Sequence, residues 1–411
     1  MKTFLEDAKL ASHVLATLSS KRKIAILQQM AEILQHNHER IIVENQKDLE
    51  LAHKNNLSSA LIDRLLLNPK RIDAMATAIR EIAALKEPVG RVLDGWMVPS
   101  GLRIEKVSIP IGVVAIIYES RPNVTSDTAA LCFKSGNVCV LKGGKEAFYS
   151  NSIIASLLQD VLEKNHLPKA CIALLADYTR EGVAKLIKMN EYVDVIIPRG
   201  GEALIRFVSE NATIPVIKHD KGVCHTFVDE EANLDQAIEI ILNAKCQRPS
   251  ACNALETLLV HEKIAKLFLP RVHNALKKAQ TQIKGCEKTR QLIDVERVSE
   301  EDYFIEHLSN AMNIKVVESI DEAIAHITRF GSSHSEAILT KNHINAEYFL
   351  NAVDASCVYV NASTRFTDGG EFGFGAEVGI STNKLHARGP MGINDLTTYK
   401  FKVYGNGQIR E

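Results

Sequence analysis

From Gly112 onward, short apolar runs alternate with longer amphipathic runs, and this rhythm constrains the fold more than any other feature. Short apolar runs bounded by turn residues are typical of buried strands, and longer periodic runs of helices. The predicted strands are Val113–Tyr118, Val138–Leu141, Cys171–Leu175 and Val193–Ile197, and the predicted helices are Thr125–Phe133, Phe148–Lys164 and Thr179–Lys188. Strands that alternate with helices in this way form a parallel, doubly wound α/β sheet.

The rest of the chain predicts a second set of alternating strands and helices and a separate β element. This second set consists of helix Glu262–Ala279 and strands Ile314–Val317, Ala337–Leu339 and Cys357–Val360. Since 411 residues exceed the size of a single core, two or three domains are expected. Val89–Ser108 alternates around a Pro-Ser-Gly turn and predicts a β-hairpin, with Thr397–Tyr404 as a neighbouring strand. Such a hairpin needs cover for its edges, often from another subunit.

Charge and cysteine usage exclude several classes of function. The 49 basic and 50 acidic residues nearly cancel, so no nucleic acid or membrane surface is expected as a partner. Charges near Met1 do not fit a signal peptide, and the apolar run Val107–Tyr118 is too short to span a bilayer. The eight cysteines lack zinc-ligand spacing, so no metal site is expected and a cytoplasmic protein with free thiols is predicted.

Cys252 is the candidate nucleophile. It lies in the polar stretch 243–254, between the helix-patterned run Ala232–Ala244 and the apolar strand Leu258–Val260. A thiol on such a connection is presented by rigid elements and can attack a carbonyl as a thiolate. The alternative is a small apolar side chain that fills a gap in the core.

Two glycine turns could receive a nucleotide, although neither G-x-G-x-x-G nor a Walker sequence is present. In the first, Lys142 and Lys145 flank two glycines between a strand and a helix. In the second, Gly200 and Gly201 hold the same position. Helix starts favour anions, and two such turns on one sheet favour a dinucleotide site. The alternative for each is an ordinary tight β–α turn.

Two further segments carry candidate binding residues. Asn123 lies where the chain leaves a strand through Pro122, and its amide could donate to an oxyanion or serve as an ordinary helix cap. The glycine-rich stretches 361–379 and 386–392 contain Arg365 and Arg388. They predict a loop that folds over a charged ligand, or alternatively a flexible surface loop.

Together these segments resemble the aldehyde dehydrogenase superfamily, and most closely its reductases that act on γ-glutamyl phosphate in proline biosynthesis. The most specific matching segments are Tyr118–Thr125, Val140–Ala147, Gln247–Ala254, Val360–Gly370 and Leu385–Gly392. The resemblance implies a nicotinamide nucleotide-binding domain (1–88 and 110–228), a catalytic domain (229–385) and a small β oligomerisation arm (89–109 and 386–411). A homo-oligomer is therefore expected, and an association with glutamate 5-kinase is left open.

The resemblance also implies roles for individual residues. Cys252 matches the nucleophile that becomes acylated by the acyl phosphate, and Asn123 the oxyanion donor. NADPH is the implied cofactor, with Lys142 at the adenosine ribose, Lys145 at its phosphate, and Gly200 and Gly201 at the pyrophosphate. The candidates for binding the substrate phosphate and carboxylate are Arg248, Arg365, Arg388 and Lys221, and the candidates for lowering the thiol pKa are Lys245 and Arg248.

One departure from the wider superfamily bears on the reaction. Hydrolytic members carry a water-activating Glu, and the corresponding segment here, Lys218–His225, has none. Its absence favours reduction of a thioester over hydrolysis. His219 and His225 in this segment are phosphate-contact candidates or, as we expect, core histidines. Two alternatives remain: a hydrolytic NAD(P)-dependent aldehyde dehydrogenase, and a non-catalytic nucleotide-binding protein of the same fold.

Overall fold

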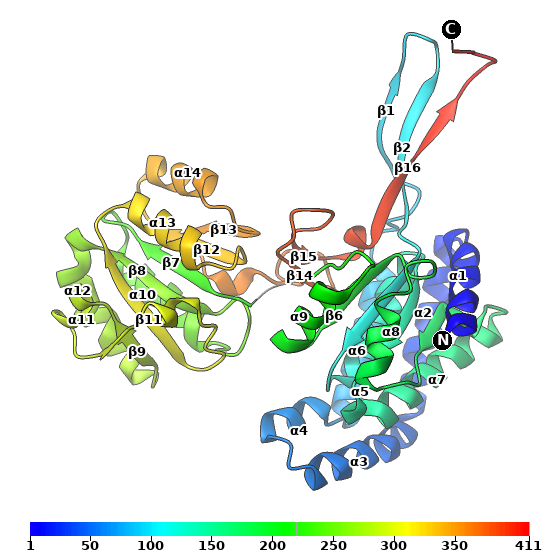
Figure 1. The fold of residues 1–411 in the computed structure, drawn as a ribbon, viewed down its shortest axis with the longest axis horizontal. Helices are drawn as coiled ribbons and strands as arrows, with labels where there is room; N and C mark the ends of the chain where they lie inside the picture. Colours follow the sequence, from blue (N-terminus) through cyan, green and yellow to red (C-terminus); the bar gives the residue numbers. More distant parts are fainter. Residues whose placement is uncertain (219–220, 411) are drawn as a thin grey trace. The chain divides into compact units, whose positions relative to one another are not determined.

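Two compact units make up the chain in the computed structural model, which describes residues 1–218 and 221–410. Unit 1 comprises Met1–Lys218, Gly373–Gly379 and Met391–Glu411, and unit 2 comprises His219–Phe372 and Ile380–Pro390. Each unit contains its own parallel sheet with helices around it (Figure 1). The predicted α/β class is therefore confirmed.

The sheet of unit 1 has four parallel strands in the order β5-β4-β3-β6. The strands are β3 (Val113–Tyr118), β4 (Val138–Lys142), β5 (Ile172–Leu174) and β6 (Val195–Arg199). The helices that follow them are α6 (Pro122–Lys134), α7 (Phe148–Lys164), α8 (Arg180–Leu186) and α9 (Glu202–Asn211). All six residues of β3 are buried, as expected for a central strand with both faces covered.

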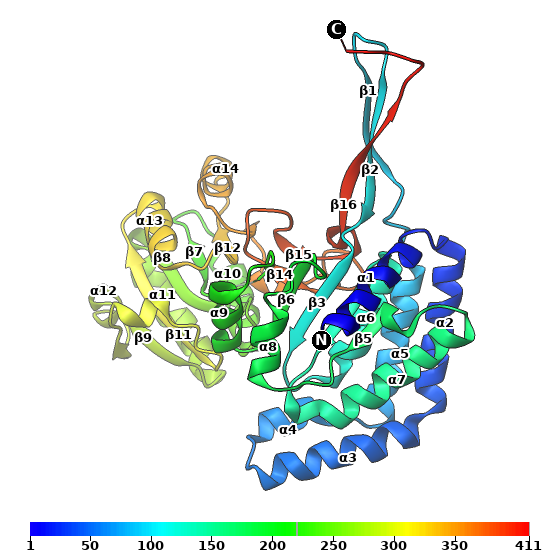
Figure 2. The same ribbon diagram turned by 45° about the vertical axis from the view of Figure 1, so that its right-hand side comes forward.

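The first part of unit 1 is a helical scaffold. The helices are α1 (Lys2–Ala16), α2 (Ser20–His36), α3 (His38–Lys54), α4 (Ser59–Leu65) and α5 (Pro69–Ala84). The Ser19 hydroxyl caps α2 by accepting a hydrogen bond from the backbone N–H of Arg22. α2 packs against α5 and α7, so this scaffold braces the helices of the sheet (Figure 2).

A separate antiparallel ribbon belongs to unit 1. It consists of β1 (Val92–Met97), β2 (Arg103–Pro110) and β16 (Thr397–Tyr404), with β2 in the centre. This confirms the predicted hairpin of β1 and β2. It also confirms β16 as the neighbouring strand, although β16 is far from the hairpin in sequence. The ribbon extends away from the helices of unit 1, and every residue of β1 is exposed (Figures 1 and 2).

Unit 2 contains a seven-stranded parallel sheet in the order β10-β9-β11-β8-β7-β12-β13. Its strands are β7 (Cys224–Val228), β8 (Leu255–His261), β9 (Gln282–Gly285), β10 (Glu296–Arg297), β11 (Ala311–Val317), β12 (Ser335–Leu339) and β13 (Cys357–Val360). Its helices are α10 (Leu234–Cys246), α11 (Glu262–Lys278), α12 (Glu287–Arg290), α13 (Ile320–Phe330) and α14 (His343–Ala352).

Apolar side chains of the central strand β8 point alternately to the two faces of the sheet and contribute to the core of unit 2 on both. Leu258 and Val260 pack with the apolar residues of α10 and α11. Leu259, between them, packs with those of α13 and α14. Successive strand residues point to opposite faces, so one apolar run serves two helical layers.

The predicted boundary between the two large domains at residue 228 is wrong. The chain enters unit 2 after Lys218, because β7 pairs with β8 and β12 in the centre of the second sheet. The chain later passes between the units through the short paired strands β14 (Gly379–Ser381) and β15 (Gly389–Met391), so 386–390 belongs to unit 2 rather than to the arm. Within the described ranges, no helix combines the length and apolar character needed to cross a bilayer.

Candidate functional site

Cys252 lies in the nucleophile loop, residues 247–254, which joins α10 to β8 in unit 2. The thiol-bearing residue is half-buried in a turn. The seven residues of β8 that follow are all buried, so the loop is anchored directly to the core. The loop therefore presents Cys252 at the amino ends of the neighbouring strands β7 and β8.

The backbone of Cys252 rests against the segment that leads into β7. A Cβ added to Gly222 would lie 1.7 Å from the carbonyl oxygen of Cys252, so only a glycine fits there. The thiol of Cys224 donates to the same carbonyl oxygen at 3.3 Å. Gly222 and Cys224, in the segment that leads into β7, therefore both contact the backbone of Cys252.

Residues 364–367 hold the nucleophile loop from another direction. The Asn253 amide donates to the carbonyl oxygen of Thr367 at 2.8 Å, and the Thr364 hydroxyl donates to the carbonyl oxygen of Asn253 at 2.7 Å. Arg365 donates from Nε to Gln247 Oε1 at 2.9 Å and from its guanidinium to Asn253 Oδ1. Arg365 therefore bridges residues on both sides of Cys252.

Arg365 also interacts electrostatically with Cys252. Burial lowers the pKa of Arg365, and the neighbouring charge of Arg248 lowers it further, whereas Cys252 opposes the shift. A positive charge that is held in place beside a thiol favours the thiolate. The structure thus brings three of the predicted residues, Cys252, Arg365 and Arg248, into one cluster.

We predict that Arg365→Ala slows alkylation of Cys252 by iodoacetamide at pH 7 by roughly threefold to tenfold, because the thiolate loses its fixed cation. Peptide mass spectrometry over time measures the rate at Cys252 itself. Arg329→Ala removes an exposed arginine from α13 of the same unit and is the matched control. An unchanged rate in Arg365→Ala would show that the guanidinium does not act on the thiol.

Lys245, by contrast, is wrong as a thiol-activating residue. Its ammonium lies 3.1 Å from Glu256 Oε2, and both side chains are fully buried. Desolvation lowers the pKa of Lys245 and raises that of Glu256 to about 8. The last turn of α10 directs this lysine into the core, where the two groups pair with each other.

The remaining substrate-binding candidates of unit 2 have different surroundings. Arg388 donates to Asp354 Oδ1 at 2.7 Å, and Lys384 lies 2.5 Å from the other oxygen of the same carboxylate. These hydrogen bonds lower the pKa of Asp354. Lys221 precedes Gly222 in the segment that leads into β7. Lys221 is thus adjacent in sequence to the glycine that contacts Cys252, and Arg388 is paired with Asp354.

His225 is a core residue, as expected. It lies on β7 with no exposed surface, and its Nδ1 is 2.9 Å from Glu336 Oε2. The backbone N–H of His225 donates to the same carboxylate oxygen at 2.7 Å. His219 lies outside the described residues.

Asn123, the candidate oxyanion donor, is the second residue of α6 in unit 1. Its side chain is exposed at the carboxyl end of β3. The amide nitrogen donates to Asp127 Oδ2 at 2.9 Å, one helical turn further on. An amide has two N–H groups, so the second remains available to a ligand.

Lys142 and Lys145 differ sharply in their surroundings. Lys142 ends β4, and its buried ammonium donates to the carbonyl oxygens of Tyr178 at 2.9 Å and Gly143 at 3.2 Å. Desolvation lowers its pKa. Lys145 is exposed in the turn before α7. At Gly143 an added Cβ would lie 2.3 Å from the amide nitrogen of Asn151, so the Asn151 side chain would have to move to admit a larger residue.

The second glycine turn already binds a carboxylate. Gly200 and Gly201 connect β6 to α9, and the backbone N–H of Gly201 donates to Glu119 Oε2 at 2.8 Å. A Cβ on Gly200 would lie 2.7 Å from that same oxygen. The start of α9 thus receives an anion, which is what a pyrophosphate requires of it.

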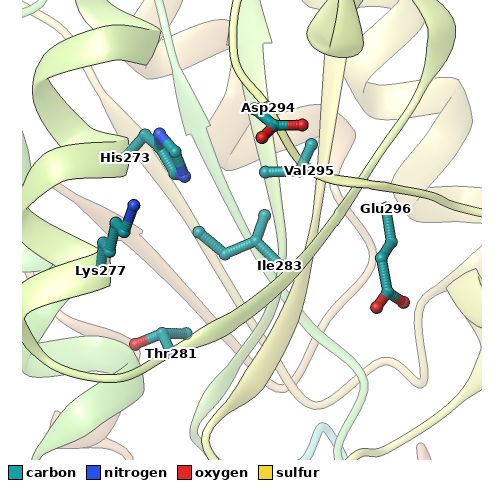
Figure 3. A pocket seen from close by; sticks show the side chains of 7 residues that line it. All are labelled: His273, Lys277, Thr281, Ile283, Asp294, Val295 and Glu296. Atoms are coloured by element: carbon teal, nitrogen blue, oxygen red, sulfur yellow. The ribbon is translucent and has the colours of Figure 1, made fainter.

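A pocket in unit 2 is lined by none of these residues. It is formed where α11 ends and β9 and β10 begin, and Figure 3 shows its charged and apolar side chains. Its lining residues are His273, Lys277, Thr281, Ile283, Asp294, Val295 and Glu296. None of the predicted site residues belongs to it, so it is not the candidate active site.

Comparison with known proteins identifies the family. The sequence pattern of the aldehyde dehydrogenase family matches residues 1–311. The chain belongs to the aldehyde dehydrogenase family. Two relatives within it, from Sulfurimonas denitrificans and Nautilia profundicola, are 65% and 62% identical, with all of both chains covered, and are named gamma-glutamyl phosphate reductase.

A solved structure of the family extends this likeness to the fold. The gamma-glutamyl phosphate reductase of Thermotoga maritima is 47% identical, with 100% of this chain and 99% of that chain covered and a TM-score of 0.98. An acetylating aldehyde dehydrogenase from Geobacillus thermoglucosidasius is only 17% identical but still reaches a TM-score of 0.69. The predicted relationship to this family is confirmed.

Proposed function

We propose that the protein reduces L-glutamyl 5-phosphate to L-glutamate 5-semialdehyde with NADPH and releases phosphate, as a step of proline biosynthesis. The observation that carries the proposal is full-length identity of 62–65% to proteins named gamma-glutamyl phosphate reductase. The nucleophile loop supports it, because Cys252 is half-buried, seated on Gly222 and paired electrostatically with Arg365.

The first half of the reaction uses the thiol. The Cys252 thiolate forms a bond to the acyl carbon, the bond from that carbon to the phosphate oxygen breaks, and phosphate leaves with the electron pair. The carbonyl oxygen carries negative charge in between, and the Asn123 amide donates to it. Arg248, Arg365, Arg388 and Lys221 are the proposed contacts for the phosphate and the carboxylate of the substrate.

The second half needs the nicotinamide nucleotide, which supplies a hydride to the thioester carbon when it is bound. Lys142 and Lys145 are the proposed contacts for the adenosine ribose and its phosphate. The start of α9 at Gly200 and Gly201 is the proposed pyrophosphate site, and Glu119 has to leave Gly201 for that contact to form. Collapse of the reduced adduct breaks the carbon–sulfur bond, releases the aldehyde and returns the thiolate to Cys252.

Reduction is favoured over hydrolysis by what surrounds the thioester. The segment 218–225 contains no Glu to correspond to the water-activating Glu of hydrolytic relatives. Glu336, an acidic side chain on β12, is fully buried and bound to His225. A thioester that is not hydrolysed persists long enough to accept hydride.

Phosphate dependence is the decisive test. Run in reverse with the cyclised semialdehyde and NADP, the enzyme should form NADPH only when phosphate or arsenate is added, because one of these must take the acyl group from sulfur. Absorbance at the NADPH band measures the rate. Full turnover in a phosphate-free buffer would favour the hydrolytic reading, and no turnover with any nicotinamide nucleotide would favour a non-catalytic protein.

We also propose a homo-oligomer and a cytoplasmic location. The ribbon β1-β2-β16 exposes Trp96, Tyr399, Phe401 and Val403, and Trp96 and Phe401 meet edge to face at 6.1 Å. Its two edge strands and apolar side chains fit a second copy of the chain. All eight cysteines lie in the described residues and none forms a disulfide, as expected in a reducing compartment. An association with glutamate 5-kinase would protect the unstable substrate.

A further inference from the structure

Asp127 binds the side chain that is proposed to stabilise the oxyanion. The two residues lie one turn apart on α6, and Asp127 Oδ2 accepts from Asn123 Nδ2 at 2.9 Å. The Ser126 hydroxyl lies 2.9 Å from the carbonyl oxygen of Asn123 and 3.2 Å from Asp127 Oδ1. Asn123 is thus held through its side chain and its backbone by the next turn of the helix.

The chemistry of the two groups selects one orientation of the amide. An ionised carboxylate only accepts hydrogen bonds, so it attracts the N–H side of the Asn123 amide and repels its oxygen. Without the carboxylate, a half-turn of the amide would exchange nitrogen and oxygen at almost no cost in shape. An amide oxygen turned toward a developing oxyanion would oppose the reaction rather than assist it.

The surroundings keep Asp127 mostly ionised at neutral pH. Desolvation raises its pKa to about 6, and the hydrogen bonds from Asn123 and Ser126 and the charge of Arg199 on β6 limit that rise. A half-buried carboxylate that keeps its charge costs desolvation energy. The partners of this carboxylate on α6 are the amide of Asn123 and the hydroxyl of Ser126.

We propose that Asp127 is a positioning residue, which fixes the Asn123 amide so that one N–H binds Asp127 and the other is presented to the oxyanion. This inference rests on the proposed role of Asn123. The inference adds that the Asp127 carboxylate determines which side of the Asn123 amide faces the oxyanion. Asp127 itself touches neither substrate nor thiol in the proposed reaction.

A double-mutant cycle tests the proposal with the full-length enzyme. Asn123→Ala should lower kcat about 100-fold or more, the usual loss for one oxyanion donor, and Asp127→Ala should lower it about tenfold to 100-fold. Asn123→Ala/Asp127→Ala should be no slower than Asn123→Ala alone, because there is then no amide to orient. The KM for NADPH should stay within about twofold in all three variants.

Conservative and control variants separate orientation from folding. Asp127→Asn keeps an acceptor oxygen and should recover part of the kcat lost in Asp127→Ala. Asp160→Ala removes a half-buried aspartate from α7 of the same unit and should keep wild-type kcat. Iodoacetamide alkylation of Cys252, which forms no oxyanion, should proceed at the wild-type rate in every variant.

The outcomes are distinguishable. If Asn123→Ala keeps wild-type kcat, the proposed oxyanion role fails and the inference fails with it. If Asn123→Ala is impaired but Asp127→Ala is not, only the positioning role is overturned. Losses that multiply in the double variant would also overturn it, since they would show that Asp127 acts independently of the amide.

Discussion

Cys252→Ala is expected to abolish NADPH-dependent reduction, with kcat at least about 1,000-fold below wild type. In the proposed mechanism the whole reaction passes through an acyl group on this sulfur, and removal of a covalent nucleophile commonly costs several orders of magnitude. Mass spectrometry of the wild-type enzyme mixed with substrate but no reductant should find the added glutamyl group on the Cys252 peptide. The same experiment on Cys252→Ala should find none.

Two controls keep this result specific. Cys246→Ala removes another half-buried thiol at the end of α10 and should keep wild-type activity. Cys252→Ala should still bind NADPH, measured by nucleotide fluorescence, because all proposed cofactor contacts lie in unit 1. Near-wild-type turnover in Cys252→Ala would contradict the nucleophile assignment and with it the proposed chemistry.

Gly222→Ala is expected to lower kcat by about 100-fold or more. Its Cβ would lie 1.7 Å from the carbonyl oxygen and 2.8 Å from the Cα of Cys252, so one of the two backbones must shift by an ångström or more. A displacement of about 1 Å at a reacting group can cost about 100-fold in rate. Steady-state kinetics measure the loss, and thermal unfolding reports the accompanying strain of about 1–3 kcal/mol.

The matched control is Gly95→Ala in β1. A Cβ there would meet its nearest atom, the carbonyl oxygen of Ile104, at 3.5 Å, which is an ordinary contact. This variant should keep wild-type kcat and unfolding temperature. If Gly222→Ala also kept wild-type kcat, the segment before β7 would be able to shift without moving Cys252. That segment would then not determine the position of the nucleophile.

Much of the architecture could be predicted from local patterns. Helix α7 and strands β3, β13 and β16 begin and end where the sequence placed them, because each is bounded by clear breaks in its own periodicity. The glycine turns after β4 and β6 were found for the same reason. Lys245 could also have been placed correctly: it falls four residues after Ile241 on the apolar face of α10, which predicts burial.

Contacts between segments far apart in sequence could not be predicted. Cys224 lies 28 residues from Cys252, and Arg365 lies 112 residues from Asn253, yet both contacts define the nucleophile loop. The domain boundary was missed for a related reason. β7 has the composition of a buried strand of either sheet, and only its pairing with β8 and β12 assigns it to unit 2.

The sequence by itself determined the α/β class, the family and the candidate nucleophile, because periodicity and short motifs are local properties of the chain. Tertiary structure alone decided which groups surround the candidate nucleophile. Arg365 rather than Lys245 lies beside the thiol, and Gly222 sets its backbone. Close packing and charge pairing depend on which strands become neighbours, and that choice is made only when the whole sheet forms.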